Sequence, residues 1–199
     1  MRLAKAAVFA ASLTPFAWLV YAAFADRLGA EPVEKIASVT GVSALIFLFI
    51  TLSITPLRRA TGWNALIRFR RMLGLFAFFY AVLHASDYFV FDQSLSPAYI
   101  AEDVVEHPWV LFGFTAFVLL IPLAVTSTKG WVRRLGGRRW QRLHLLVYPV
   151  AVLGVLHYFL AVKRDVSQPV LFGGILAVVL LARFVYRSPD RRRGANFRP

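Results

Sequence analysis

The sequence has no cysteine and few acidic residues for its length. Without thiols the chain cannot form disulfides, thiolate-bound zinc sites, iron–sulfur clusters or a covalently attached c-type haem, and it has no cysteine nucleophile. Its 199 residues include 10 Asp and Glu against 23 Lys and Arg, for a formal net charge of +13. Charged residues make up 17% of the chain and hydrophobic residues 59%. A soluble domain rarely combines so apolar a composition with so large a charge.

Apolar runs recur along the whole chain, each of about twenty residues and thus long enough to cross a hydrocarbon core of roughly 30 Å. They predict an all-α, polytopic membrane protein folded as one bundle of six transmembrane helices. The expected spans are Ala6–Ala25, Ile36–Thr55, Met72–Phe91, Trp109–Thr126, Leu143–Val162 and Val170–Tyr186. We expect a transmembrane domain over 1–187 and a short basic cytoplasmic tail over 188–199. The loops are too short for a separate soluble catalytic domain.

The first span also has features of a secretory signal peptide. Arg2 and Lys5 precede its apolar stretch, and small residues occur near its end. Its full span length, together with Pro15 and Trp18, favours an uncleaved anchor instead. We therefore count it as the first transmembrane helix.

Basic and acidic residues alternate between successive loops. Segments 56–71 and 127–142 hold only basic charges, whereas segment 92–108 holds only acidic ones and segment 26–35 has a small acidic excess. The bias of Lys and Arg toward cytoplasmic loops therefore places both termini on the cytoplasmic side of the membrane. Topology and contact with anionic membrane lipids explain the basic residues, and a nucleic-acid partner is not expected.

Three of the four histidines fall inside expected spans: His84 on the third, and His144 and His157 on the fifth. Ionisable side chains are costly in hydrocarbon, so each of these three is a candidate functional residue. The fourth, His107, lies beside Pro108 in the acidic loop and is expected to be solvated.

His84 and His157 are predicted to lie at the same depth. His84 is eight residues before Asp92, and His157 is six before Lys163. At about 1.5 Å per residue, both side chains lie roughly 9–12 Å from the outer boundary. Two neutral imidazoles facing each other at one depth suit the axial ligands of a b-type haem. A hydrogen-bonded pair or a proton relay fits the spacing as well.

His144 and Arg70 mark a second depth, nearer the cytoplasm. His144 is thirteen residues before His157, which is about 20 Å along a helix. Arg70 is fourteen residues before His84 on nearly the same helical face. Arginine does not ligate iron, but it pairs with a haem propionate, a flavin phosphate or a quinone oxygen. The alternative is that His144 only packs or caps the start of its helix.

Several other polar and aromatic residues lie in or near the expected spans. Asp87, three residues after His84, either orients that imidazole or lies at a helix interface. Tyr148 and Tyr158 are read as core or cofactor-edge residues. Four tryptophans near span ends fit an interfacial aromatic belt: Trp63, Trp109, Trp131 and Trp140.

Two long stretches, Ile54–His84 and Thr126–Tyr158, resemble the MsrQ family, also called YedZ. These proteins are the haem-binding membrane subunits of the bacterial periplasmic methionine sulfoxide reductase system. The family is similar in turn to the transmembrane domain of ferric reductases and NADPH oxidases, in which the third and fifth helices supply histidines to stacked haems. The resemblance implies that His84, His144 and His157 occupy haem-ligand positions. The inner histidine of the third helix is missing and Arg70 lies nearby, so the number of haems, one or two, stays open.

The resemblance further implies an electron-transfer subunit of a bacterial inner membrane rather than a complete enzyme. Electrons would pass from the quinone pool or a cytosolic flavin reductase to the periplasmic molybdopterin subunit MsrP, which reduces methionine sulfoxide in oxidised proteins. Family members are described with haem b and FMN, although this chain has no glycine-rich phosphate loop.

Two other functions compete with this one. A quinone-linked or ferric-reductase-like cytochrome would have the same fold and haem with another acceptor. A haem-free transporter would use the histidines to move protons, but only Asp87 is a carboxylate clearly within a span, and proton-coupled carriers commonly need such groups.

Overall fold

The computed structural model describes residues 2–162 and 165–185, so the expected tail over 188–199 lies outside the described residues. Over these ranges the chain is helical and has no strand. The long helices are α1 (Arg2–Ser12), α2 (Thr14–Phe24), α3 (Pro32–Thr61), α4 (Ile67–Asp87), α6 (Pro108–Val125), α9 (Val147–Ala161) and α10 (Ser167–Val185). The shorter ones are η1 (Asn64–Leu66), η2 (Tyr88–Asp92), α5 (Pro97–Glu106), α7 (Lys129–Leu135), α8 (Gly137–Leu143) and η3 (His144–Leu146).

Five helical segments in the described ranges are long and apolar enough to cross a membrane. They are Pro32–Thr61, Asn64–Asp92, Pro108–Val125, Gly137–Ala161 and Ser167–Val185. A sixth is added if α1 and α2 together form one span. The prediction of an all-α polytopic membrane protein is confirmed.

The first expected span, Ala6–Ala25, is not one continuous helix. It is broken into α1 and α2, which meet at an angle of 40°. In an unbroken helix the Phe16 N–H would donate to the Ser12 carbonyl. Here the hydroxyl of Tyr80, from α4, lies between them: it donates to the Ser12 carbonyl at 2.7 Å and accepts from the Phe16 N–H at 3.2 Å. The inserted hydroxyl and Pro15, which has no N–H to donate, account for the bend.

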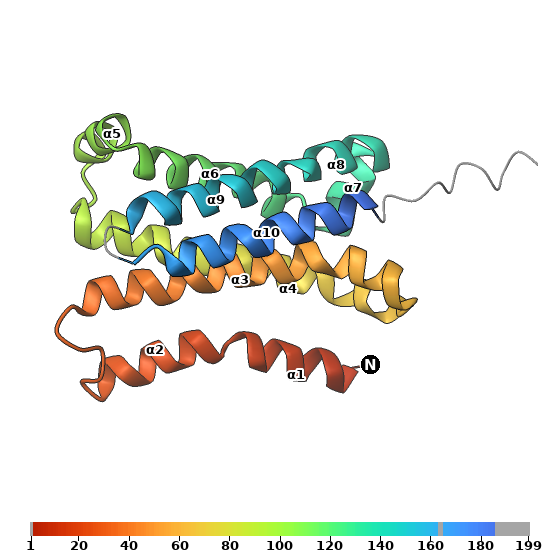
Figure 1. Ribbon diagram of the computed structural model, residues 1–199, viewed down its shortest axis with the longest axis horizontal. Coiled ribbons are helices and arrows are strands. Elements are labelled where there is room, and N and C mark those ends of the chain that lie inside the picture. Colours follow the sequence, from red (N-terminus) through yellow and green to blue (C-terminus); the bar gives the residue numbers. More distant parts are fainter. Residues whose placement is uncertain (1, 163–164, 186–199) are drawn as a thin grey trace, which may run out of the picture.

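The loops gather by charge at the two ends of the bundle (Figure 1). Segments 56–71 and 127–142 lie at one end, which we call the basic end, together with the start of α1 and the last turn of α10. Segments 26–35 and 92–108 lie at the opposite end, which we call the acidic end. The alternation predicted from the loop charges is thus present, while the cytoplasmic assignment of the basic end stays a prediction.

The core is formed where α3 packs along α4 and α6 packs along α9. Leu52, Tyr80 and Val150 are almost completely buried there, and the rings of Phe47 and Tyr80 stack with centroids 5.4 Å apart. Large apolar side chains of α10 face outward instead, as expected of a helix surrounded by lipid. The fifth expected span, Leu143–Val162, begins earlier than predicted, at Gly137, and includes the tight turn η3.

Arg183 links α10 to α3 and α9, a role that its position in the sequence does not indicate. Its Nε donates to the Leu52 carbonyl at 2.8 Å and its Nη1 to the Tyr148 hydroxyl at 2.6 Å. The Leu52 carbonyl needs this donor because Pro56, four residues later in α3, has no N–H. An unpaired carbonyl in a bundle interior is costly, so Arg183 compensates for the proline.

Replacing Arg183 with methionine is expected to lower the free energy of unfolding by about 1–3 kcal/mol, the usual cost of an unpaired buried polar group. Thermal and denaturant unfolding in mild detergent measure the loss. Pro56→Ala restores an N–H for the Leu52 carbonyl, so the Arg183→Met loss should shrink in that background. Arg68→Met, at an exposed position of α4, is the matched control and should have little effect. If Arg183→Met lowers the free energy of unfolding equally in the wild-type and Pro56→Ala backgrounds, Arg183 does not compensate for the proline.

Candidate functional site

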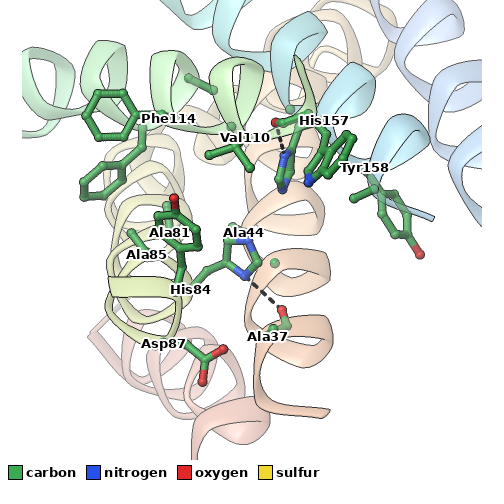
Figure 2. Close-up of a pocket in the computed structure, with 18 of the residues that line it drawn as sticks. Ala37, Ala44, Ala81, His84, Ala85, Asp87, Val110, Phe114, His157 and Tyr158 are labelled. Carbon is green, nitrogen blue, oxygen red and sulfur yellow. Dashed lines mark hydrogen bonds between the residues drawn. The ribbon is translucent and has the colours of Figure 1, made fainter. Parts of the chain in front are cut away.

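A cavity of about 600 Å³ lies among α3, α4, α6 and α9, toward the acidic end. Its size falls in the range of typical ligand sites, about 300–1,000 Å³. Apolar side chains form most of the wall, and His84 and His157 both line it (Figure 2).

The two histidines meet across this cavity from different helices. His84 comes from α4 and His157 from α9, and their ring centroids are 5.9 Å apart with the planes inclined at 73°. Figure 2 shows the rings facing each other. The prediction that the two rings face each other is confirmed, while their common depth in a membrane stays a prediction. A metal–imidazole bond is about 2 Å long, so an ion between two rings bonds both when their centres are about 6 Å apart.

Both imidazoles are held by main-chain carbonyls. The His84 Nδ1 lies 3.0 Å from the Ala37 carbonyl oxygen, and the His157 Nδ1 lies 2.7 Å from that of Trp109. A carbonyl only accepts, so each Nδ1 carries the hydrogen and donates it. Each Nε2 therefore keeps a free lone pair. Metal-binding histidines are commonly oriented by such a bond from the second ring nitrogen.

Two glycines let the rings lie directly against neighbouring helices. A Cβ on Gly113 of α6 would be 2.7 Å from the His157 Nδ1 and 2.9 Å from its Cε1. A Cβ on Gly41 of α3 would be 3.1 Å from the His84 Cε1. Neither position was singled out from the sequence. Any larger residue would displace the imidazole that it faces.

Asp87 does not orient His84, so that alternative is wrong. Its side chain is only 4% exposed and lines the cavity, yet neither carboxylate oxygen has a hydrogen-bond partner among the described residues. Main-chain carbonyls hold both histidines instead.

The two tyrosines have different surroundings. Tyr158 lines the cavity and donates to the Gln168 side chain at 2.8 Å, whereas the Tyr148 hydroxyl accepts from Arg183.

At the acidic end, Asp103 joins η2 and α5 to the start of α6. Its Oδ2 accepts from the Tyr88 hydroxyl at 2.6 Å and from the Gln93 amide at 2.9 Å. Its Oδ1 lies 2.7 Å from the His107 Nδ1. His107 also packs against Trp109, while its side chain stays 39% exposed, so it is partly solvated as expected and is held by Asp103 as well.

His144 and Arg70 form a separate cluster nearer the basic end, as predicted. The His144 Nε2 lies 3.2 Å from the Thr126 hydroxyl, and its ring stacks on Trp140 with centroids 3.9 Å apart. Trp140 also donates to the Thr126 carbonyl at 2.9 Å, so it packs in the bundle rather than serving only as a belt residue. Arg70 lies close enough to His144 and Arg183 to interact electrostatically with both. His144 does not line the cavity of the histidine pair.

The fold and the site define a class: a polytopic helical membrane protein with two carbonyl-anchored histidines facing each other in an apolar cavity. Residues 37–155 match the family described as "Ferric reductase like transmembrane component". That match includes Arg70, His84 and His144, and it ends two residues before His157.

More particularly, the chain belongs to the MsrQ family. It is 54% identical over 195 residues to the "Protein-methionine-sulfoxide reductase heme-binding subunit MsrQ" of Herminiimonas arsenicoxydans, covering 97% of this chain and 89% of that protein. It is 49% identical over 193 residues to the protein of the same name from Rhodospirillum rubrum, covering 97% and 93%. A third relative with this name, from Xanthomonas oryzae pv. oryzae, is 50% identical over 199 residues, covering 97% and 91%. No solved structure matches the chain.

Proposed function

We propose that this protein is a b-type cytochrome subunit that binds haem between His84 and His157. It passes electrons across a bacterial inner membrane to the periplasmic molybdopterin subunit MsrP, which reduces methionine sulfoxide in oxidised proteins. The relatives share most of their length with this chain and are named heme-binding subunits of a protein-methionine-sulfoxide reductase.

The observation that carries the proposal is the state of the two imidazoles. Each Nδ1 donates to a carbonyl, so each Nε2 has a lone pair to offer within one apolar cavity. The described residues contain no group of three or more His, Cys, Asp or Glu placed to hold a metal ion. Two protein ligands suit an iron that is already held by a porphyrin, and the apolar wall suits the macrocycle.

When bound, haem would supply an iron that takes up and gives back one electron. The protein residues would hold it and set its surroundings. His84 and His157 would both bind that iron, which favours electron transfer over oxygen binding. The carbonyls of Ala37 and Trp109 fix both rings, and the apolar wall limits water, two factors that tune the reduction potential.

Electrons would enter at the basic end, which we place in the cytoplasm with both chain termini. Arg70 and His144 are the proposed binding residues there. A guanidinium suits an anionic group, such as a propionate of a second haem or the phosphate of FMN. A quinone or a cytosolic flavin reductase would be the donor. The acidic end would then face the periplasm, where the histidine pair lies close to the exit.

Spectroscopy of the purified protein tests the proposal. We expect a low-spin b-type spectrum in mild detergent, with haem counted by pyridine haemochrome. A count near two haems per chain would indicate a second haem bound at His144. Haem reduced by dithionite should be reoxidised when MsrP and methionine sulfoxide are both added, but not with either alone.

The outcomes of this test separate the competing functions. A protein that stays colourless after expression with ample haem would contradict the cytochrome and favour a transporter. A haem that MsrP does not reoxidise would favour another acceptor, as the ferric-reductase likeness allows.

A further inference from the structure

A buried carboxylate shares the cavity with the two histidines. Asp87 is 4% exposed, and neither of its oxygens has a hydrogen-bond partner among the described residues. Figure 2 places it on the cavity wall next to His84, with its carboxylate turned away from that ring. An ionised carboxylate in apolar surroundings is costly unless it is paired with a cation or well hydrogen-bonded.

Within residues 2–162 and 165–185, no cation is paired with Asp87. The titratable groups that line the same cavity are Glu34 of α3, His84 of α4, Tyr88 and Asp92 of η2, Asp103 of α5, and His157 and Tyr158 of α9. Of these, Asp92 adds a like charge near Asp87. Arg27, between α2 and α3, lies over the Tyr21 ring, and Lys35 of α3 lies over the Trp18 ring. Helices α2 and α6 carry no charged side chain. The basic residues of α1, Arg2 and Lys5, lie toward the basic end.

We propose that Asp87 takes up a proton when the haem between His84 and His157 is reduced, and releases it when the haem is oxidised. The inference rests on the proposed function. One electron, from a reduced flavin, a quinol or dithionite, converts iron(III) to iron(II). One proton from water binds a carboxylate oxygen of Asp87. On oxidation the electron passes to the acceptor, and the proton returns to water.

The physical reason is charge balance in a medium of low dielectric constant. An electron added to the cavity brings a negative charge toward a carboxylate, and the two repel strongly because little water screens them. Binding a proton removes that repulsion. The histidines are not available for this role, since each Nδ1 already carries a hydrogen and each Nε2 would bind iron.

The cavity also gives the proton a route. Its lining extends from Asp87 to three carboxylates at the acidic end, those of Asp92, Glu34 and Asp103. Of these three residues, Asp92 and Glu34 are exposed to solvent. Water reaches carboxylates at this mouth, so protons exchange there without crossing the apolar bundle.

Potentiometric titration of the haem-loaded protein at a series of pH values tests the proposal. Over the range in which Asp87 exchanges its proton, the midpoint potential should fall by up to 59 mV per pH unit, the value for a tenfold change with one electron. Asp87→Asn should largely remove this slope and raise the potential at the alkaline end. The control variants Glu102→Gln and Glu106→Gln, at exposed positions of α5 outside the cavity lining, should keep the slope. A slope that is absent in the wild type, or unchanged in Asp87→Asn, overturns the proposal.

Infrared difference spectra between reduced and oxidised protein provide a second readout that needs only the wild type. Reduction should add the carbonyl stretch of a protonated carboxyl group, and Asp87→Asn or Asp87→Ser should lack it. If both variants lose haem, a wild-type spectrum without this band still overturns the proposal. Failure of the proposed function would look different: either no haem would be bound, or a haem with the same pH-dependent potential would not be reoxidised by MsrP.

Discussion

Replacing His84 with alanine is expected to abolish the low-spin b-type haem spectrum of the purified protein. The reason is that only one of the two imidazole ligands, His157, would remain to bind the iron, and the cavity lining has no other imidazole in place of the lost one. His157→Ala should have the same effect. Absorption spectra of the oxidised and reduced proteins, with pyridine haemochrome counts, measure the loss.

His107→Ala is the matched control for this loss. It removes a histidine that bonds Asp103 at the acidic end and does not line the cavity, so the spectrum should be kept. His144→Ala should also keep the signal of the His84–His157 haem, and a drop in haem count there would reveal a second haem at the basic end. A normal low-spin spectrum in His84→Ala would remove the ligand assignment.

The sequence predicts the histidine pair well because depth in a membrane follows from simple counting. Helix rise is nearly constant, and charged loops mark the span ends, so His84 and His157 are placed at one level without any tertiary information. Counting alone does not show that the two rings point toward each other. The separation of 5.9 Å between the His84 and His157 ring centroids confirms that they do. The cluster of Arg70 with His144 follows from the same counting.

Features that depend on contact between distant residues were not predictable in this way. Hydropathy extends through the break between α1 and α2, because the inserted hydroxyl comes from Tyr80, more than sixty residues away. In the sequence, Arg183 resembles the other basic residues that mark the cytoplasmic ends of the spans. Its role depends on Pro56, which leaves the Leu52 carbonyl without a helical donor, and Arg183 supplies that donor. Asp87 shows the limit of a spacing rule, since three residues separate it from His84 and yet its carboxylate does not bond that ring.

Replacing Gly113 with alanine is expected to impair haem binding without unfolding the protein. The new Cβ would lie 2.7 Å from the His157 Nδ1, closer than atoms tolerate, so the ring must move and its bond to the Trp109 carbonyl must lengthen or break. Alanine in a helix is favoured over glycine by about 0.5–1 kcal/mol, which opposes any loss of overall stability. Haem content should therefore fall, and the bound fraction should lose low-spin character, while thermal unfolding of the haem-free protein stays near that of the wild type.

A graded series of glycines makes this expectation specific. At Gly41 the new Cβ would lie 3.1 Å from the His84 ring, so a small shift relieves the contact and Gly41→Ala should lose less haem than Gly113→Ala. At Gly174 of α10 nothing lies within 4 Å, so Gly174→Ala is the matched control and should bind haem normally. Haem content that follows this order would tie the loss to space for the imidazoles. Equal haem content in all three variants would mean that neither ring needs its glycine, and the fixed position of His157 would then have to come from the Trp109 carbonyl alone.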